Sequence, residues 1–202
     1  MVRRLLILIV AVPLFMWSNQ SCKTGQEEEK WSIRMANSVM ERYDSLGYYN
    51  GRERIRWSYD VALLGMAIDK LGDVDPKYTD YMKAYMDYFL DGEGNIKTYS
   101  MDSYNIDNIN PGKNLITLYK LTGDEKYKRA IDTLVEQMMH HPKTESGGFW
   151  HKKRYPWQMW LDGIYMGSAF LAQYAAEFDQ PAWFDTVAHQ VLLIHEKTLD
   201  EE

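Results

Sequence analysis

A helical hairpin recurs along this chain, and the recurrence constrains the fold more than any other feature of the sequence. Residues 70–73 (Lys-Leu-Gly-Asp) resemble residues 120–124 (Lys-Leu-Thr-Gly-Asp) at a period of about fifty residues, and residues 177–179 (Glu-Phe-Asp) form a weaker third copy. An aromatic side chain follows each of these turns: Tyr78, Tyr127 and Trp183. Each copy is typical of two helices joined by a tight turn. The repeat therefore predicts an all-α protein, either an open solenoid or a closed ring of hairpins.

Apolar side chains recur at three- and four-residue spacings along seven stretches, each of which we expect to form a helix. The stretches are 31–46, 58–71, 76–90, 111–121, 124–140, 156–178 and 181–197. Their connections alternate between tight turns and long segments, and the last long segment predicts a short hairpin. The long segments are 47–57, 91–110 and 141–157. Successive connections of an up-and-down array fall on opposite faces, so the long segments gather on one face, where we expect the functional site.

The first 21 residues are typical of an export signal. Arg3 and Arg4 form a short basic region, and residues 5–17 are an apolar run too short for a membrane span. Cys22, the only cysteine, follows directly, as in bacterial lipoprotein signals. We expect Cys22 to be lipidated, with simple cleavage as the alternative. Incorporation of labelled palmitate distinguishes the two.

The remainder divides into a charged tether, residues 22–30, and one domain, residues 31–202. We expect the protein to be exported, to the periplasm or as an outer-membrane lipoprotein of a bacterium, and to meet the membrane through its lipid anchor only. Loss of residues 1–21, which carry two arginines and no acids, changes the net charge from −6 to −8. A chain this acidic is a poor nucleic-acid binder, so we expect no nucleic-acid partner.

Residues 155–166 combine one carboxylate, Asp162, with a high density of aromatic and thioether side chains. If this segment is helical, the neighbours of Asp162 at three- and four-residue spacing are mostly apolar. Those neighbours are Gln158, Met159, Tyr165 and Met166. Burial in such a stripe raises the proton affinity of a carboxyl group, as a general acid requires, although a helix start near Pro156 would oppose this.

Two further acids belong to the long segments. Asp107 lies among asparagines just ahead of a helix, where hydrogen-bond donors and the helix dipole keep a carboxylate ionised. Together Asp107 and Asp162 form a pair with opposed environments, the usual arrangement for acid–base chemistry on sugars. Asp60 follows Ser58, and for it we favour helix capping or stabilisation of the helix dipole.

Ordinary structural roles remain open for each of these residues. Asp107 alone is typical of a loop or capping acid, and Asp162 alone of a satisfied buried carboxyl. Residues 151–154 (His-Lys-Lys-Arg) are typical of a solvated hairpin, or offer positive charge to an anionic substrate. The remaining histidines show no metal-ligand spacing with acids, so we expect neither a metal nor a cofactor. They are His140, His141, His189 and His195.

Four motifs in these segments together resemble those of the unsaturated rhamnogalacturonyl hydrolases, which belong with glycosyl hydrolase families 88 and 105. The motifs are Trp-Ser-Tyr-Asp at 57–60, Tyr-Asn-Ile-Asp-Asn-Ile at 104–109, Gly-Gly-Phe-Trp-His-Lys at 147–152, and Tyr-Pro followed by Gln-Met-Trp-Leu-Asp-Gly-Ile-Tyr-Met at 155–166. The resemblance covers nearly the whole chain after the tether. It implies an (α/α)6 barrel, a toroid of six helical hairpins.

The resemblance also implies a reaction and its residues. Such enzymes release 4,5-unsaturated galacturonic acid from the non-reducing end of pectin lyase products, by protonation of C4 and addition of water at C5. Asp162 would be the general acid and the base that activates water, and Asp107 its partner. Trp160 and His151 fall where the family lines its sugar pocket. The same motifs give the other candidate substrate-binding residues: Trp57, Tyr59, Asp60, Asn105, Lys152 and Gln158.

One departure from the family is large, because a closed barrel needs about twelve helices and the pattern predicts about seven. The family's later His- and Arg-containing motifs have no counterpart before Glu202. We therefore expect an incomplete barrel, the N-terminal half of such an enzyme, which lacks turnover alone. The alternatives are a non-catalytic, lipid-anchored carbohydrate-binding protein and an unsaturated glucuronyl hydrolase acting on glycosaminoglycan fragments.

Overall fold

The computed structural model describes residues 30–200. The predicted signal, Cys22 and nearly all of the tether lie outside these residues and stay predictions. Seven α-helices account for most of the described chain: α1 (Trp31–Arg42), α2 (Tyr59–Asp69), α3 (Lys77–Phe89), α4 (Gly112–Thr122), α5 (Glu125–Met139), α6 (Ala169–Glu177) and α7 (Ala182–Thr198). Four shorter helical turns, η1 (Leu46–Gly51), η2 (Met101–Ser103), η3 (Ile106–Ile109) and η4 (Ile164–Ser168), lie between them. Over residues 30–200 the structure has isolated bridges but no strand, which confirms the all-α prediction.

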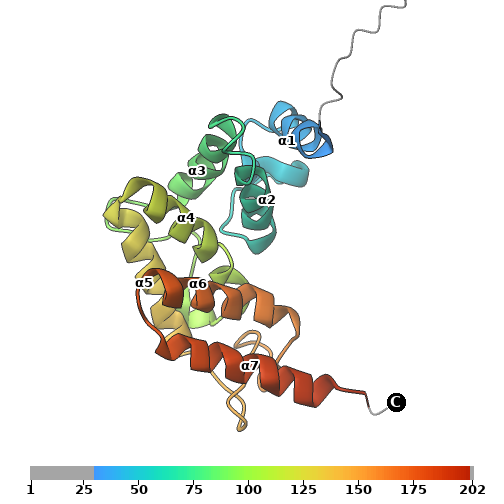
Figure 1. The fold of residues 1–202 in the computed structure, drawn as a ribbon, viewed down its shortest axis with the longest axis vertical. Coiled ribbons are helices and arrows are strands. Elements are labelled where there is room, and N and C mark those ends of the chain that lie inside the picture. The colour runs from blue at the N-terminus through green and yellow to red at the C-terminus, as the bar shows by residue number, and fades with distance from the viewer. Residues whose placement is uncertain (1–29, 201–202) are drawn as a thin grey trace, which may run out of the picture.

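Three hairpins follow one another along an arc: α2 with α3, α4 with α5, and α6 with α7 (Figure 1). Within the arc, α4 contacts α2, α3 and α6, so the second hairpin packs between the first and the third. The tight turns fall at the ends of α2, α4 and α6, as the repeat predicts. Gly123 and Asp179 adopt left-handed φ angles of 66° and 50° there, conformations that end a helix sharply.

The core lies between the packed helices of the arc. Its fully buried aromatic side chains come from α3, α5 and α6. They include Tyr78, Tyr85, Phe89, Tyr127 and Phe170. Among residues 30–200, no helix has both the length and the apolar character needed to cross a bilayer.

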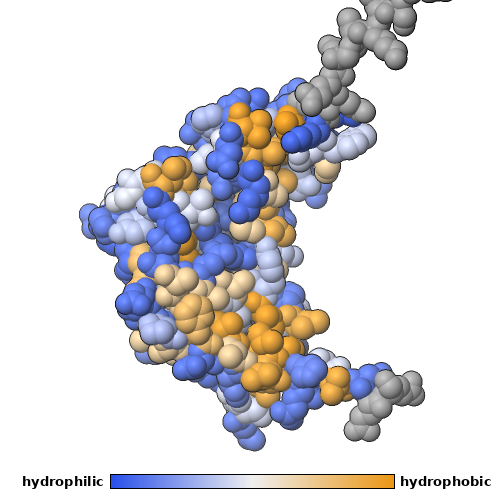
Figure 2. Space-filling model, in the orientation of Figure 1, coloured by the Kyte–Doolittle hydropathy of each residue, from blue (hydrophilic) through white to orange (hydrophobic). Residues whose placement is uncertain are grey.

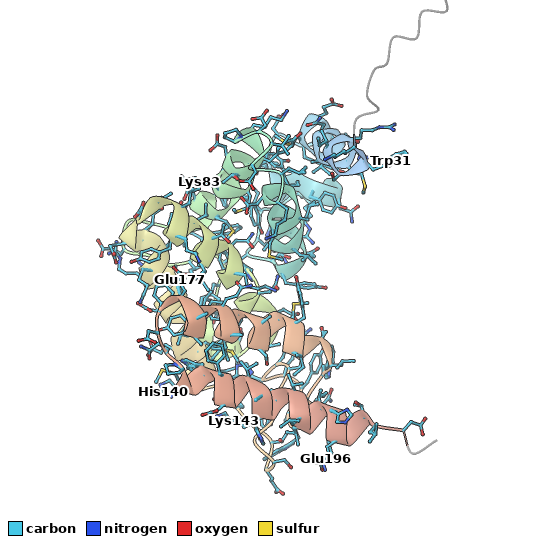
Figure 3. The ribbon with its side chains drawn as sticks, viewed as in Figure 1. Trp31, Lys83, His140, Lys143, Glu177 and Glu196 are labelled. Atoms are coloured by element: carbon cyan, nitrogen blue, oxygen red, sulfur yellow. The ribbon has the colours of Figure 1, made fainter. Side chains whose placement is uncertain are left out.

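The two ends of the arc carry exposed apolar side chains. Trp31 and Met35 on α1 are each 68% exposed, and Leu192 on α7 is 65% exposed. Trp31 and Glu196 mark these two ends in Figure 3, and Figure 2 shows apolar surface over the part of the arc that α6 and α7 form. In a closed ring of hairpins such faces are covered by neighbouring hairpins. The described residues thus form an incomplete toroid, as the sequence predicts.

Two predicted helices differ from those observed. The first ends at Arg42 rather than 46, because Ser45 adopts an extended backbone and its side chain accepts a hydrogen bond from the Gly47 amide, which starts η1. The sixth was expected from residue 156, but residues 158–160 are irregular and helical structure begins only at Asp162.

The start of α4 packs too closely to admit a side chain at Gly112. A Cβ built there would lie 2.5 Å from a ring carbon of Phe170 and 2.9 Å from Leu134 Cδ1. We expect Gly112→Ala to lower the free energy of unfolding by about 1–3 kcal/mol, because neither fully buried neighbour has room to move. Urea unfolding of both proteins measures the change. Gly92→Ala is the matched control, since its Cβ meets nothing within 4 Å, and a loss as large as that of Gly112→Ala would contradict the packing argument.

Candidate active site

The long segments meet on one face of the arc, as predicted. Asn105 and Lys152 form an antiparallel bridge, the Ile106 amide donates to His151 O at 3.0 Å, and the Trp57 indole Nε1–H donates to Asn108 O at 2.8 Å. These contacts bring together residues about fifty positions apart in sequence. The face also carries the starts of α2 and α4, which follow these segments directly.

Asp107, His151 and Asp162 form one cluster on this face. His151 Nε2 lies 3.2 Å from Asp107 Oδ1, and His151 Nδ1 lies 3.8 Å from Asp162 Oδ1. The imidazole is thus placed between the two carboxyl groups that the sequence paired. No other acid enters this cluster among the described residues.

Asp107 is held as a carboxylate. Its side chain is buried in η3, and burial alone would raise its pKa, but hydrogen bonds from His151 and from Lys152, whose Nζ lies 2.6 Å from Oδ2, hold the pKa below the usual value. Asn105 shapes the turn, because its side chain accepts a hydrogen bond from the Asp107 amide at 3.1 Å. These contacts agree with the sequence prediction of an ionised Asp107, although the donors to its side chain are His151 and Lys152 rather than the asparagines.

His151 is fixed on every side. Its amide donates to Gln158 O at 2.7 Å, and its ring stacks on Trp160 with centroids 4.1 Å apart and planes 7° from parallel. When Nε2–H donates to Asp107, Nδ1 of a neutral imidazole is an acceptor. This Nδ1 is buried and has no hydrogen-bond partner in residues 30–200. A protonated Asp162 would supply that partner once the 3.8 Å gap closes to hydrogen-bond length.

The predicted burial of Asp162 is wrong. Its side chain is 50% exposed, because helical structure begins at Asp162 itself and leaves Gln158 and Met159 in the preceding loop. Directly afterwards the π-helical turn η4 widens the helix, and Gly167 there packs within 2.9 Å, measured from an ideal Cβ, of the Ile106 side chain. Asp162 therefore stands at the mouth of the cluster and Asp107 at its base.

The aromatic wall beside the cluster is larger than the sequence indicated. Tyr155 also stacks on Trp160, with ring centroids 5.3 Å apart, and Trp160 is 39% exposed. The Trp160 indole N–H donates to Gln158 Oε1 at 3.1 Å, so Gln158 orients this ring. A stack of this kind offers a flat apolar surface on which a sugar ring can lie.

The first motif contributes less to the site than expected. Trp57 is 5% exposed, packs edge-on against Phe89 and uses its N–H on Asn108, so it belongs to the core. Asp60 lies in the first turn of α2, paired with Arg52 and hydrogen-bonded by Ser58, which fits the helix-stabilising role favoured from the sequence. Tyr59 is 39% exposed and remains a candidate for contact with a ligand.

Two buried polar residues that sequence reasoning missed support the cluster from behind. Gln137 Nε2 donates to Asn105 O at 3.3 Å and lies 3.4 Å from His141 Nδ1, and His141 Nε2 donates to Trp150 O at 2.7 Å. This chain of contacts joins the backbone before Asp107 to the backbone before His151. Gln137 lies on the buried face of α5, and His141 follows two residues after the end of that helix, so their spacing of four residues was the available signal.

His141 should make stability depend on pH. Burial is the main cause that lowers its pKa from 6.5 to about 4. Because its folded-state pKa is depressed, protonation favours the unfolded chain, so the stability due to neutral His141 is present above pH 6.5 and is lost as pH falls towards 4. We expect a loss of about 3 kcal/mol across this window in urea unfolding. His141→Gln should flatten the dependence, whereas His140→Gln, at an exposed neighbour, should not; an equal slope in all three proteins would contradict the assignment.

A cavity of about 410 Å³ adjoins the cluster on the side of Lys152, and its other lining residues are Ser103, Asn105, Lys153 and Arg154. The basic run 151–154 therefore offers positive charge at the site, one of the two roles that the sequence left open. One possible metal-ligand atom from each residue of the cluster, Asp107, His151 and Asp162, lies within 4.8 Å of the other two, a spacing that a metal ion could use. The Lys152 ammonium beside Asp107 opposes this, because it repels a second cation from the same carboxylate.

The chain is similar to known glycoside hydrolases over most of its length. The model of the family described as Glycosyl Hydrolase Family 88 matches residues 31–202. A structure of a glycoside hydrolase from family 105 of C. acetobutylicum ATCC 824 is 39% identical, with a TM-score of 0.79 over 86% of this chain. A possible member of the GH105 family from Salmonella enterica serovar Paratyphi A, 21% identical, shares the fold with a TM-score of 0.60 over 84% of this chain. The chain spans about half the length of these two structures, 47% and 48%.

Proposed function

Because the chain belongs to glycosyl hydrolase family 88, we propose that its site removes 4,5-unsaturated galacturonic acid from the non-reducing end of oligosaccharides made by rhamnogalacturonan lyases. The observation that supports this most directly is the difference between the two carboxyl groups around His151. Asp107 is buried and held as a carboxylate by Lys152 and His151, whereas Asp162 is half exposed at the mouth. One group is therefore placed to hold substrate and the other to exchange protons with it.

The proposed reaction hydrates the C4=C5 double bond rather than attacking the glycosidic carbon. Asp162 gives its proton to C4, and positive charge develops at C5 and the ring oxygen. The Asp162 carboxylate then takes a proton from water as the water oxygen bonds to C5, which restores the acid. The resulting hemiketal opens and collapses, and the next sugar leaves with its own oxygen.

The remaining residues have positioning roles in this scheme. The sugar ring lies against Trp160, and the ionised Asp107 accepts hydrogen bonds from sugar hydroxyls. His151 holds Asp107 through Nε2 and directs Nδ1 towards Asp162, and its own position is fixed because its ring is stacked and its backbone is bonded on both sides. The positive run 151–154 attracts the acidic substrate to a protein whose net charge is negative.

The test is turnover of unsaturated galacturonyl-rhamnose. The 202-residue chain is assayed beside a chimera in which residues 31–202 replace the matching part of the clostridial family 105 enzyme, because this chain covers 47% of that protein and the 39% identity is high enough for the helices to pack. Loss of the ultraviolet absorbance of the conjugated double bond, with release of rhamnose, is the expected result for the chimera. Binding without any turnover, while the clostridial enzyme itself is active, would favour the carbohydrate-binding alternative and refute the proposal.

A further inference from the structure

A second cationic pocket lies on the same face, separate from the one beside Lys152. It has a volume of about 580 Å³ and is lined by Arg52, Glu53, Arg54, Arg56, Trp57 and Ser58. Its lining includes none of the cluster residues Asp107, His151 and Asp162. Three arginines against one glutamate make it locally positive, in a protein whose net charge is negative.

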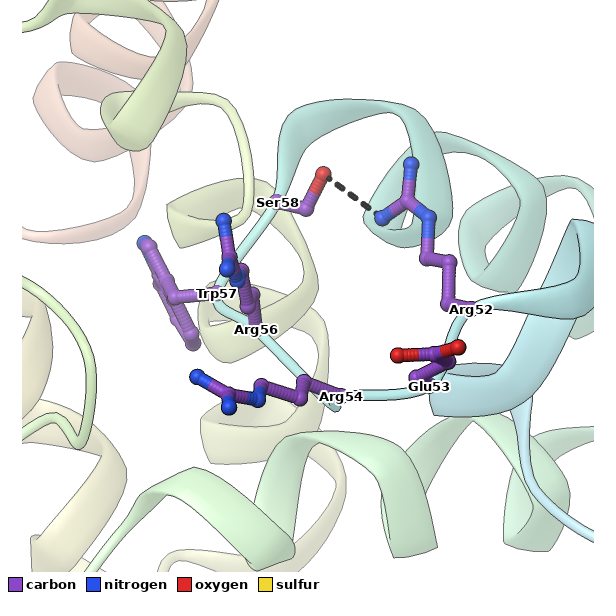
Figure 4. A pocket seen from close by; sticks show the side chains of 6 residues that line it. All are labelled: Arg52, Glu53, Arg54, Arg56, Trp57 and Ser58. Carbon is purple, nitrogen blue, oxygen red and sulfur yellow. Dashed lines mark hydrogen bonds between the residues drawn. The ribbon is translucent and has the colours of Figure 1, made fainter.

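The three arginines are not equivalent. Arg52 is paired with Asp60 and donates to Ser58 Oγ at 3.2 Å, so its charge is neutralised within the fold. Arg54 and Arg56 are exposed, and neither guanidinium has an ion-pair or hydrogen-bond partner in the described part of the chain. Figure 4 shows both guanidinium groups on the side of Trp57, whereas Arg52 lies towards Ser58. Two guanidinium groups that line one pocket without a partner in the described residues favour an anion between or beside them.

The backbone that carries these two arginines is fixed. The Tyr85 hydroxyl donates to Arg56 O at 2.9 Å, and the Trp57 amide donates to Thr98 Oγ1 at 2.9 Å. The Trp57 indole reaches across to Asn108 O, the residue directly after Asp107. An anion bound here therefore loses little affinity to ordering of the loop, and it lies in a defined position relative to the cluster.

The two cationic segments attach to opposite ends of η3. Lys152 bridges to Asn105 at its start, and Trp57 bonds to Asn108 near its end. A single acidic sugar at the cluster has Lys153 and Arg154, which line the pocket beside Lys152, for its carboxylate. The loop 52–58 is then available to bind an anionic group that lies farther along the oligosaccharide.

We propose that Arg54 and Arg56 form a subsite for a second anionic group, a carboxylate or a sulfate ester, on the oligosaccharide whose terminal unsaturated residue lies at Asp107 and Asp162. This inference rests on the proposed function for the position of the terminal residue. The planar guanidinium group matches both anions, because each offers two oxygens to a pair of N–H donors. The preferred substrates are then oligosaccharides with an acidic residue beyond the cleaved bond.

Titration calorimetry on the chain carrying Asp162→Asn, which prevents turnover, tests the subsite. The ligands are an unsaturated oligosaccharide with one internal uronate, its counterpart with that uronate reduced to the alcohol, and a counterpart with a sulfate ester in its place. We expect each anionic ligand to bind at least about tenfold more tightly than the reduced one at low salt. A larger ratio for sulfate or for carboxylate identifies the natural anion.

Arg54→Gln with Arg56→Gln should reduce these ratios to about one, and Arg42→Gln should leave them unchanged. Arg42 is exposed on α1 and bonds only to Ser38 in its own helix, so Arg42→Gln removes one positive charge from the surface without touching the loop. Circular dichroism confirms that each variant is folded. Ratios that survive the double substitution, or that are absent from the outset, would overturn the subsite. Turnover of unsaturated galacturonyl-rhamnose, which has no second charge, reports separately on the proposed function.

Discussion

Asp162→Asn should abolish turnover of the unsaturated disaccharide and leave its binding nearly unchanged. An amide has nearly the same shape as a carboxyl group but can neither give a proton to C4 nor take one from water, so we expect kcat to fall by a factor of about 10²–10⁴. Since Asp162 is half exposed, loss of its charge should change the free energy of unfolding by no more than about 0.5 kcal/mol. Single-turnover kinetics in the chimera, with urea unfolding of the same protein, measure both quantities.

The control for this variant is Asp179→Asn, which makes the same chemical change at the turn before α7. It should keep full turnover. A rise in KM at unchanged kcat for Asp162→Asn would mean that Asp162 binds substrate in the ground state and is not the proton donor.

Asp107→Asn should damage both activity and stability, in contrast to the first variant. The substitution leaves the Lys152 ammonium buried without its carboxylate, and it removes the acceptor of the His151 Nε2–H. We expect a loss of about 3 kcal/mol in the free energy of unfolding near pH 7 and a fall in kcat of at least about a hundredfold. Because the folded-state pKa of Asp107 is lowered, its contribution is present above the ordinary value of 3.8 and is lost as pH falls through the folded-state pKa. The free energies of unfolding of the unchanged protein and of Asp107→Asn should therefore approach each other in acid.

A double-mutant cycle separates the two effects. Lys152→Met removes the unpaired charge, so Asp107→Asn combined with Lys152→Met should recover part of the stability, by about 1–2 kcal/mol relative to the sum of the single changes. Turnover should not recover, because the carboxylate that we propose to accept hydrogen bonds from sugar hydroxyls is still absent. Strict additivity of the stability changes would show that the pair Asp107–Lys152 does not interact as the 2.6 Å contact indicates.

The layout of the fold could be predicted from the sequence because its signals are local. A glycine or aspartate ends α2, α4 and α6, and apolar residues at three- and four-residue spacings define each helix between these turns. The alternation of tight and long connections then placed Asp107 and Asp162 on one face. This step needed only the up-and-down order of the helices.

The burial and the contacts of individual side chains could not be predicted from the spacing of apolar residues. Asp162 was expected inside a helical stripe, but the helix starts at that residue, so two of the four neighbours lie in a loop. Trp57 was expected in the substrate pocket, yet its indole N–H finds an acceptor at Asn108, fifty-one positions away, and this contact holds it in the core. His151 was assigned by resemblance, and its place between the two acids follows from the bridge of Asn105 with Lys152, which no local pattern reveals.

The π-helical turn η4 makes the direction of the Asp162 side chain depend on the number of residues in that turn. A π turn holds one residue more than an α turn, and one residue corresponds to a rotation of about 100° around a helix axis. A homologue with one residue deleted from 164–168 would keep Phe170 and Leu171 in the core, since these are fully buried and anchor the phase of α6. The whole rotation would then fall on the start of the helix and turn the carboxyl away from His151. We therefore expect the length of this turn to distinguish relatives that retain the acid at the site from relatives that carry it elsewhere, even where the aspartate itself is unchanged.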